Sequence, residues 1–405
     1  MREILFLAHR LPWPPDRGDK IRSWHLLKRL AEIAPVHLAC FADETDEASA
    51  RAALAPFVTT LCLAPRTRSQ AMGALIGLAQ RKAFSLSLFE SAEIRDFVAK
   101  TMKEREIGCV FGYSAQMAQF VPADVGKARF VMDFVDVDSA KFESYAETAG
   151  PVMQRVYRRE ARKLFAFEAQ TARRADVSLY VSESEAGLFR RLSGLGADKV
   201  IAVQNGTGLV FFDPNGNYPP PDVHGPLIVF TGQMDYRPNV EAVVRFARET
   251  MPLIRKASPQ ARFAIVGRHP DPAVQALAEL PGVIVTGEVA DVRGWLAAAN
   301  AVVAPLGIAR GVQNKVLEAM AMARAVVASP AAYEGIEAVA GRDLLVAQGS
   351  KAEAEAVLGL LGNAERAREI GRAARARIEA HYGWAARLAE LPAIIGMDAP
   401  VRVAP

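Results

Sequence analysis

The stretch VVAPLGIARGVQNKVLEAMAMARAVVAS, residues 302–329, decides the fold. It predicts a buried strand over residues 301–304, a polar loop containing glycine, a short helix from Asn314 and a second apolar strand. Such a unit directs backbone N–H groups and the positive end of a helix at the loop, which suits an anionic ligand. Lys315 and Glu318 are three residues apart, so they share one helix face. The opposite face can pack through Val316, Leu317 and Met320. By spacing alone, Lys315 and Glu318 are also consistent with an ordinary surface ion pair.

The rest of the chain repeats this alternation of strand and helix in both halves. The first half has strand patterns at 2–8, 35–41, 58–63, 108–112, 128–134, 177–181 and 199–203, separated by helical patterns at 21–33, 91–104, 152–174 and 183–193. The second half has strand patterns at 226–231, 262–266, 283–286, 300–304, 325–328 and 343–346, separated by helical patterns near 239–256, 272–279, 291–299, 314–323 and 350–361. Alternation of this kind predicts an α/β fold with two doubly wound, Rossmann-like parallel sheets.

The chain length agrees with two domains. At 405 residues it is too long for one typical core. Residues 211–222, rich in Pro, Gly and Asn, lack periodicity and are interpreted as the linker. We therefore predict domains at 1–212 and 213–383, with the C-terminal segment 384–405 returning to the first.

Composition indicates a globular protein in a reducing compartment. Apolar residues make up 51% and charged residues 23% of the chain. The apolar run of the first strand is too short for a signal peptide, and no cleavage site follows it. Cys40, Cys62 and Cys109 lie in apolar surroundings without metal-like spacing, so we expect buried free thiols and a cytoplasmic location.

The net positive charge of the chain comes entirely from its first half. Residues 1–212 hold 29 Lys and Arg against 25 Asp and Glu, whereas residues 213–405 hold 20 of each. The excess is concentrated at 65–82 and at 151–174, the latter with seven basic and two acidic residues. No nucleic-acid motif or aromatic interleaving accompanies these patches, so anionic lipid or a phosphate-bearing acceptor is the preferred partner.

Two further loops follow strands and open helices. Gly18 lies in the loop after the first strand, where it would allow close approach of backbone to a ligand. Gly232 follows the first strand of the second half, and Arg237 lies just before the next helix, an arrangement that suits a diphosphate. Each loop also has a purely structural interpretation. Gly18 would then lie in a plain Pro-rich loop, and Arg237 would be a solvated loop arginine.

Asp136 and Asp138 follow the strand at 128–134 and support three interpretations. The Asp-x-Asp pattern imitates a divalent-metal pair of GT-A glycosyltransferases. Alternatively, Asp136 lies near an acceptor hydroxyl, or Asp138 and Ser139 only cap the next helix. We predict no metal site, because GT-A enzymes have a single domain around their site whereas this chain has two Rossmann-like halves. The acceptor interpretation is what a resemblance to GT-B glycosyltransferases implies.

The segment 302–329 resembles the donor-binding motif of family 4 glycosyltransferases, which are retaining enzymes of the GT-B fold. Glu318 matches the second of that family's two glutamates, whereas Arg310 occupies the position of the first. The pattern Gly311-x-x-Asn314-Lys315-x-x-Glu318, together with Asp133-x-x-Asp136, is similar to the subgroup associated with PEP-CTERM/exosortase systems and exopolysaccharide genes.

The resemblance implies roles for these residues. Lys315 and Arg237 would bind the donor diphosphate, assisted by amides of residues 311–314, and Glu318 would bind the ribose. Gly18 and Gly232 would face the diphosphate, and Asp136 the acceptor. Arg310 cannot accept hydrogen bonds as a glutamate would, so it is expected to reinforce the diphosphate site or to read an acidic donor sugar.

The implied activity is metal-independent transfer of a sugar from a nucleotide-sugar donor, UDP- or GDP-linked, without another cofactor. The acceptor would be a glycan or a polyprenyl-linked glycan, and the enzyme would be cytoplasmic with peripheral contact at the inner membrane. A GT-B epimerase or phosphorylase and a non-catalytic sugar-nucleotide-binding relative remain the alternatives.

Overall fold

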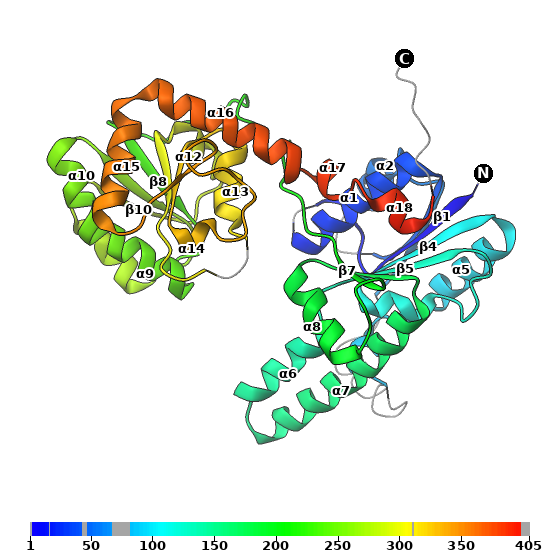
Figure 1. Cartoon of the computed structure of the whole chain (residues 1–405). Helices are drawn as coiled ribbons and strands as arrows, with labels where there is room; N and C mark the ends of the chain where they lie inside the picture. Colours follow the sequence, from blue (N-terminus) through cyan, green and yellow to red (C-terminus); the bar gives the residue numbers. More distant parts are fainter. Residues whose placement is uncertain (1, 16, 43–46, 67–81, 310–311, 398–405) are drawn as a thin grey trace, which may run out of the picture. The chain divides into compact units, whose positions relative to one another are not determined.

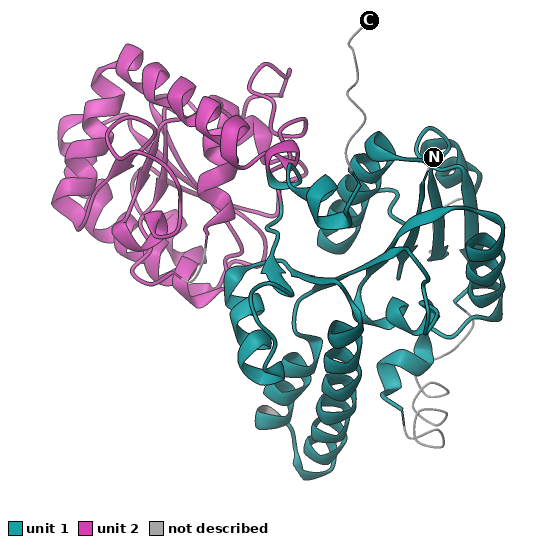
Figure 2. Cartoon of the chain, turned by 45° about the vertical axis from the view of Figure 1, so that its right-hand side comes forward, with its two compact units in different colours: residues 1–205, 387–405 teal, residues 206–386 magenta. Residues whose placement is uncertain are grey.

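The computed structural model describes residues 2–15, 17–42, 47–66, 82–309 and 312–397. The chain forms two compact units (Figure 2). Unit 1 comprises Met1–Asn205 and Arg387–Pro405, and unit 2 comprises Gly206–Ala386. Each unit is an α/β domain with its own parallel sheet, as the alternating pattern predicts.

Unit 1 is built on a seven-stranded sheet with the order β3-β2-β1-β4-β5-β6-β7 (Figure 1). Its strands are β1 (Glu3–Ala8), β2 (Val36–Phe41), β3 (Thr60–Ala64), β4 (Ile107–Tyr113), β5 (Arg129–Val135), β6 (Val177–Tyr180) and β7 (Val200–Ala202). All neighbouring strands are parallel. Helices cover both faces, so the central strands read as continuous apolar runs.

The helices of unit 1 follow the strands in the order that the sequence predicts, with additions. They are α1 (Gly18–Ile33), α2 (Glu47–Leu54), α4 (Phe84–Leu88), α5 (Ala92–Glu104), α6 (Asp138–Thr148), α7 (Pro151–Arg174) and α8 (Glu183–Ser193), with a 3₁₀ segment at Ala115–Phe120. The C-terminal α18 (Leu391–Ile395) packs on α1 and β5. The carbonyl of Leu388, just before it, accepts a hydrogen bond from Arg29 Nε at 3.4 Å.

Unit 2 contains a six-stranded parallel sheet with the order β10-β9-β8-β11-β12-β13. Its strands are β8 (Leu227–Thr231), β9 (Arg262–Val266), β10 (Val283–Gly287), β11 (Ala301–Ala304), β12 (Val326–Ala328) and β13 (Leu345–Val346). Its helices are α9 (Arg237–Arg245), α10 (Met251–Ala257), α11 (Pro272–Gln275), α12 (Arg293–Ala298), α13 (Asn314–Ala321), α14 (Pro330–Tyr333), α15 (Ser350–Gly362), α16 (Ala364–His381) and α17 (Trp384–Arg387).

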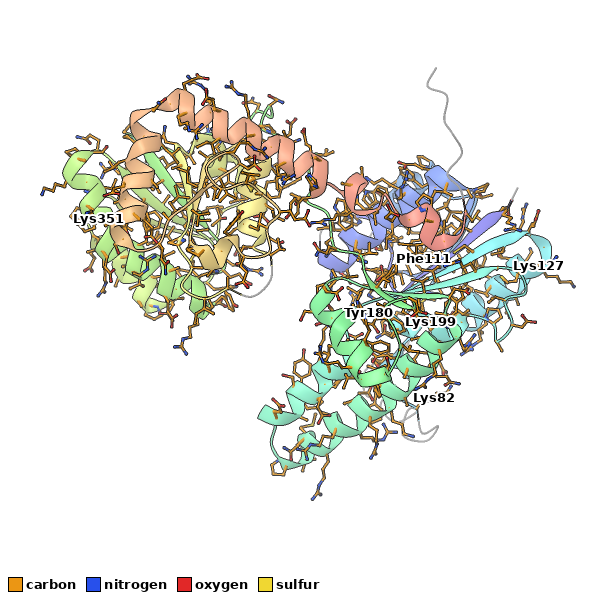
Figure 3. The ribbon with its side chains drawn as sticks, in the orientation of Figure 1. Lys82, Phe111, Lys127, Tyr180, Lys199 and Lys351 are labelled. Atoms are coloured by element: carbon orange, nitrogen blue, oxygen red, sulfur yellow. The ribbon has the colours of Figure 1, made fainter. Side chains whose placement is uncertain are left out.

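Each unit has a separate hydrophobic core. In unit 1, Phe111 and Tyr180 are fully buried among the strands, whereas Lys127 lies at the surface (Figure 3). In unit 2 the core includes Phe230 and Phe263, with no exposed surface, and extends to the buried face of α13. The three cysteines are buried free thiols, and burial raises the pKa of the Cys62 thiol to about 11.

Strand order places a topological switch point in each sheet. In unit 2, β8 pairs with β9 on one side and with β11 on the other. The loops after β8 and β11 therefore leave toward opposite faces of the sheet and open a crevice at the carboxyl ends of the strands. That crevice contains the site described below.

Two predicted helices differ from expectation. The helix expected at 239–256 is divided by a π-helical turn at Phe246–Thr250. Pro252, the second residue of α10, lacks an N–H group, so the regular hydrogen-bond ladder cannot run through it. The final apolar segment, expected as one piece from Trp384, is two short helices, α17 and α18.

Among the described residues, none of the helices combines the length and the apolar character that crossing a membrane requires.

Candidate functional site

A pocket of about 630 Å³ lies in unit 2 at the carboxyl ends of β8, β9 and β11. Its lining comes from four segments, within residues 231–239, 266–268, 288–292 and 306–318. Both α9 and α13 begin at this pocket, since Pro238, Asn239 and Asn314 line it. Two helix N-termini at one pocket favour an anionic ligand.

Lys315 is held in the pocket by contacts that the sequence does not show. Its ammonium group donates a hydrogen bond to Asn239 Oδ1 and lies 4.6 Å from the centroid of the Phe230 ring. Asn239 is 4% exposed and donates from Nδ2 to the Gln233 carbonyl at 2.7 Å. The buried amide thus fixes the cation, and the turn after β8 fixes the amide.

Burial changes the ionisation of both polar residues on α13. Desolvation lowers the pKa of Lys315 to about 8, and the charge of Glu318 opposes that shift. Desolvation raises the pKa of Glu318, and Lys315 opposes that shift in turn. An anionic ligand would therefore meet a poorly solvated cation beside a carboxyl group, an arrangement in which electrostatic interactions are strong.

The pocket floor requires two glycines. A Cβ on Gly232 would lie 2.8 Å from Asn239 Nδ2 and 3.4 Å from Lys315 Nζ. A Cβ on Gly267 would lie 1.6 Å from the carbonyl oxygen of Gly232, so the turns after β8 and β9 touch backbone to backbone. Only glycine at residue 267 permits this approach.

A second cation lines the pocket from the turn after β9. With the Gln233 amide oriented so that its oxygen faces the guanidinium, Arg268 donates to it from Nε at 3.2 Å and from Nη2 at 3.1 Å. Thr231 also lines the pocket, and its buried hydroxyl has no hydrogen-bond partner among the described residues. Both groups can serve a polar ligand.

Some of the residues predicted to bind the donor line the pocket, and Arg237 does not. Gly232, Asn314, Lys315 and Glu318 all line the pocket. Arg237 does not; its side chain is 88% exposed and pairs with Glu241 one turn along α9, Nε to Oε1 at 2.7 Å. Arg310 and Gly311 lie outside the described residues.

Gly18 and Asp136 belong to unit 1. Gly18 is the first residue of α1, and a Cβ there would have no neighbour within 4 Å among the described residues. Asp136 follows β5, one residue after Val135, whose φ of 70° is strained for a β-branched side chain. Ser114, at the end of neighbouring β4, has φ 71°. Strain at adjacent strand ends is common at functional sites.

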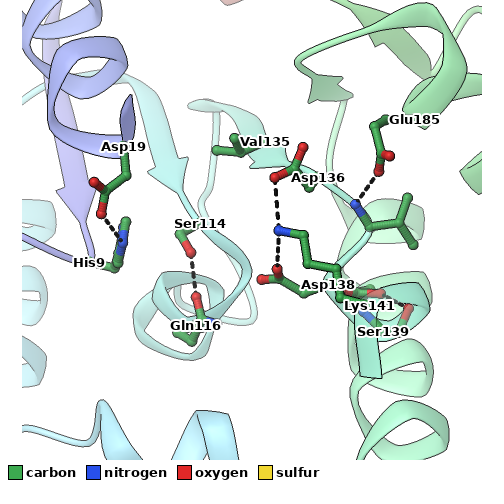
Figure 4. Close-up of polar contacts among 12 residues, drawn as sticks. His9, Asp19, Ser114, Gln116, Val135, Asp136, Asp138, Ser139, Lys141 and Glu185 are labelled. Carbon is green, nitrogen blue, oxygen red and sulfur yellow. Dashed lines mark hydrogen bonds and ion pairs between the residues drawn. The ribbon is translucent and has the colours of Figure 1, made fainter. Parts of the chain in front are cut away.

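Asp136 and Asp138 share one cation (Figure 4). Lys141 Nζ lies 2.8 Å from Asp136 Oδ2 and 3.1 Å from Asp138 Oδ1. Partial burial opposes the charge of Lys141, but the hydrogen bonds and charges of the two carboxylates raise its pKa. The described residues contain no cluster of three or more His, Cys, Asp or Glu side chains able to hold a metal ion.

A second polar group surrounds Asp19 in α1 (Figure 4). His9 Nε2, Arg10 Nε and Arg17 Nε lie 3.4, 3.3 and 2.9 Å from its carboxylate oxygens. Burial opposes ionisation of Asp19, but the hydrogen bond and charge of His9, with the two arginines, hold its pKa far below the usual value. Tyr113 donates to the Asp19 carbonyl at 2.7 Å.

A buried ion pair fixes α1 to the sheet. Arg22 Nε lies 2.9 Å from Asp133 Oδ2, and the two side chains are 1% and 0% exposed. Arg22 Nη1 also donates to Asn205 Oδ1 at 2.9 Å. Asn205, in the segment after β7, thus completes this network.

Sequence reasoning missed Asn239, Gln233 and Arg268 as pocket residues. Gln233 and Arg268 lie in turns directly after strands, and Asn239 lies in the first turn of α9. This position beyond the strand ends is the signal that could have identified them. It could not have paired them, because Gln233 and Arg268 lie in turns that are distant in sequence. Asn239 of α9 and Lys315 of α13 are likewise 76 residues apart.

Part of unit 2 matches a known protein family. Residues 225–363 match the family model described as glycosyl transferases group 1. The curated proteins contain no match.

Solved structures of the same fold cover nearly the whole chain. Sucrose-phosphate synthase from Thermosynechococcus elongatus is 17% identical with a TM-score of 0.55, covering 97% of this chain and 98% of its own. Anabaena Alr3699/HepE, solved in complex with UDP, is 12% identical with a TM-score of 0.58, covering 98% and 100%. WaaG, a glycosyltransferase involved in lipopolysaccharide biosynthesis, is 14% identical with a TM-score of 0.52, covering 97% and 100%. The group 1 glycosyl transferase family model therefore matches within unit 2, and the whole chain has the GT-B fold of these solved structures.

Proposed function

We propose that the protein transfers a hexose from a nucleoside-diphosphate sugar to a glycan or a polyprenyl-linked acceptor during exopolysaccharide synthesis. The observation that carries the proposal is that Lys315 and Glu318 of α13 both line the pocket of unit 2. Both residues lie inside the segment that matches the group 1 family. Anabaena HepE has been solved with UDP and with UDP-glucose, which supports a uridine donor over GDP.

In this proposal Lys315 neutralises the donor diphosphate, assisted by the N-termini of α9 and α13. Arg268 is a second cation for the phosphates or the base, and Glu318 accepts from the ribose hydroxyls. Arg237 retains a proposed role only if its ion pair with Glu241 opens when donor binds. No bound metal is required, because fixed cations and helix ends stabilise the leaving group.

We further propose retention of anomeric configuration, as in family 4 enzymes. The bond between the sugar C1 and the phosphate oxygen breaks while the acceptor oxygen bonds to C1 on the same face. The departing diphosphate takes the acceptor proton, so a dedicated base is unnecessary. Asp136, neutralised by Lys141, would orient the acceptor hydroxyl.

The cellular setting follows from the acceptor. A polyprenyl-linked glycan is embedded in the inner membrane, so the enzyme would work in the cytoplasm with peripheral contact at that membrane. Association with a PEP-CTERM/exosortase system belongs to the same proposal and rests on the motif at 311–318.

The test is nucleotide-induced thermal stabilisation in EDTA, with UDP, GDP, dTDP and ADP compared. Ligand that binds the native state raises the unfolding midpoint by mass action. We expect one nucleotide to stabilise the wild type and Glu355→Ala, a control on the exposed side of α15, but not Glu318→Ala. Stabilisation only with manganese would move the site to Asp136 and Asp138 and overturn the donor assignment.

Arg310 provides a separate prediction about donor choice. If its guanidinium reinforces the diphosphate site or reads an acidic sugar, Arg310→Glu should lower kcat/KM by about tenfold or more, because one charged hydrogen bond is worth about 1.5–3 kcal/mol. The measurement compares uronic acid and neutral hexose donors. Unchanged turnover and selectivity would contradict both roles.

A further inference from the structure

Helices α6 and α7 form a hairpin in unit 1 that extends beyond the sheet in both views (Figures 1 and 2). Aromatic contacts join the two helices, with ring centroids 6.2 Å apart for Phe142 and Tyr157 and 5.9 Å apart for Tyr145 and Tyr157. Gln154 Nε2 donates to the Ala146 carbonyl at 3.1 Å and closes the connection. The hairpin is therefore a packed element and can present a fixed surface.

One face of α7 carries a row of exposed arginines. Arg155, Arg158 and Arg162 recur at helical spacing, so they project from the same side. Each is exposed, and none makes an ion pair with another described residue. Val152, one turn before Arg155, continues this row to the beginning of the helix.

The acidic residues of α7 are withdrawn from that face. Glu160 is 2% exposed and accepts from the backbone N–H groups of Phe84 and Ser85 at 2.7 and 2.9 Å. Glu168 is 1% exposed and accepts from Ser139. The exposed charge of α7 is consequently positive throughout, although the helix contains two glutamates.

The tip of the hairpin exposes large apolar side chains, although Glu147 in the last turn of α6 is also exposed. Val152 is 75% exposed and Met153 is 44% exposed, although the chain buries most of its large aliphatic side chains. Tyr145, in the last turn of α6, is 53% exposed. A tyrosine with aliphatic side chains at the end of a cationic row is typical of segments that enter the headgroup region of a bilayer.

We propose that the α6–α7 hairpin is the surface by which this protein docks on anionic membranes. Arg155, Arg158 and Arg162 lie against lipid phosphates, while Val152 and Met153 enter the interface. The proposal deepens the function proposed above by naming the contact that reaches a membrane-embedded acceptor. The biological role of this contact rests on the proposed function. Vesicle binding itself does not, because it is measured without a donor.

The charge distribution favours a planar lipid surface over a flexible polyanion. The exposed carboxylates of the hairpin, Glu143 and Glu147, lie on α6. A nucleic acid or acidic glycan that wrapped the hairpin would meet these charges, whereas a bilayer can contact the α7 row alone. An apolar tip also has no counterpart in a phosphate backbone.

The experiment is flotation of the full chain with vesicles of phosphatidylcholine that contain roughly 0 to 40 mol% phosphatidylglycerol. This range takes the vesicle surface from neutral to strongly anionic. We expect partitioning to rise with phosphatidylglycerol content. The variant Arg155→Glu/Arg158→Glu/Arg162→Glu should bind at least about tenfold more weakly, because each basic residue near an anionic surface contributes to affinity. Val152→Ser/Met153→Ser should also weaken binding, most clearly at high salt, where the apolar contribution remains.

The matched control is Lys100→Glu/Lys103→Glu/Arg105→Glu, which makes the same charge change at exposed positions on α5 and just after it. It should retain at least about half of wild-type partitioning at the same lipid composition. Equal weakening by the control, or full binding by the α7 variant, would overturn the proposal. So would tighter binding to a DNA duplex than to vesicles, with the same dependence on the α7 arginines. Vesicle binding that persists in a variant unable to bind nucleotide would separate this result from failure of the proposed activity.

Discussion

Lys315 is an unusual cation because burial makes its charge dependent on pH near neutrality. Its pKa of about 8 means that the ammonium is lost as pH rises through that value. We expect nucleotide affinity to fall between pH 7 and pH 9.5, by up to about tenfold per unit above pH 8, because the anion binds the protonated form. Calorimetric titration with UDP measures the profile.

Two variants make this prediction specific. Lys315→Gln should bind weakly with little dependence on pH, whereas Lys351→Gln, at an exposed position of α15, should keep the wild-type profile. Wild-type affinity that stays constant to pH 9.5 would show that Lys315 does not contact the phosphates.

Gly267 gives a second prediction at the residue scale. In Gly267→Ala the new methyl group would collide with the Gly232 carbonyl, so the turns after β8 and β9 must separate. We expect a loss of about 3 kcal/mol or more in the free energy of unfolding, together with weaker nucleotide binding. Urea denaturation measures the first effect. Gly359→Ala on α15, where a Cβ has no described neighbour within 4 Å, should be neutral or slightly stabilising.

At the scale of elements, Glu168 couples α7 to the start of α6. Burial raises the pKa of its carboxyl group to about 7, although the Ser139 hydroxyl, donating at 2.5 Å, favours the ionised form. An unfolded chain ionises this group near its ordinary value of 4.5. Between these two values the folded state binds the extra proton, so stability falls as pH rises.

The resulting prediction compares wild type with Glu168→Gln. Wild type should lose about 3 kcal/mol of unfolding free energy between pH 4.5 and pH 7.5 as the buried carboxyl group ionises. Glu168→Gln should not show this loss, because the amide imitates the protonated acid. Denaturant unfolding at the two pH values checks the difference, with Glu143→Gln at an exposed position of α6 as the control. Parallel pH profiles for wild type and Glu168→Gln would contradict it.

At the scale of the whole molecule, each unit has its own sheet and its own hydrophobic core. We expect calorimetric unfolding to show two transitions, since the cores can melt separately. The residues that line the proposed donor pocket all belong to unit 2, so saturating UDP should raise only one of them, by mass action. In Glu318→Ala neither transition should move with UDP. A single transition that shifts as a whole would contradict independent unfolding.

The sequence by itself determined the architecture of this protein. The alternation of apolar runs with helical periodicity predicted every strand of both sheets. This works because strands that are buried on both faces are continuous runs of apolar residues. The resemblance of the loop and helix at 302–321 to a family motif also predicted Asn314, Lys315 and Glu318 for the donor site, and all three line the pocket of unit 2.

Only the tertiary structure decided how the pocket is completed. Asn239 positions Lys315 across 76 residues of chain, and the contact of Gly267 with Gly232 joins two turns that periodicity treats separately. Arg237 was predicted for the pocket by its position, yet its ion pair with Glu241 holds it along the outside of α9. Local pattern fixes which residues reach the end of a strand, whereas burial, charge and steric contact between strands fix which of them face one another.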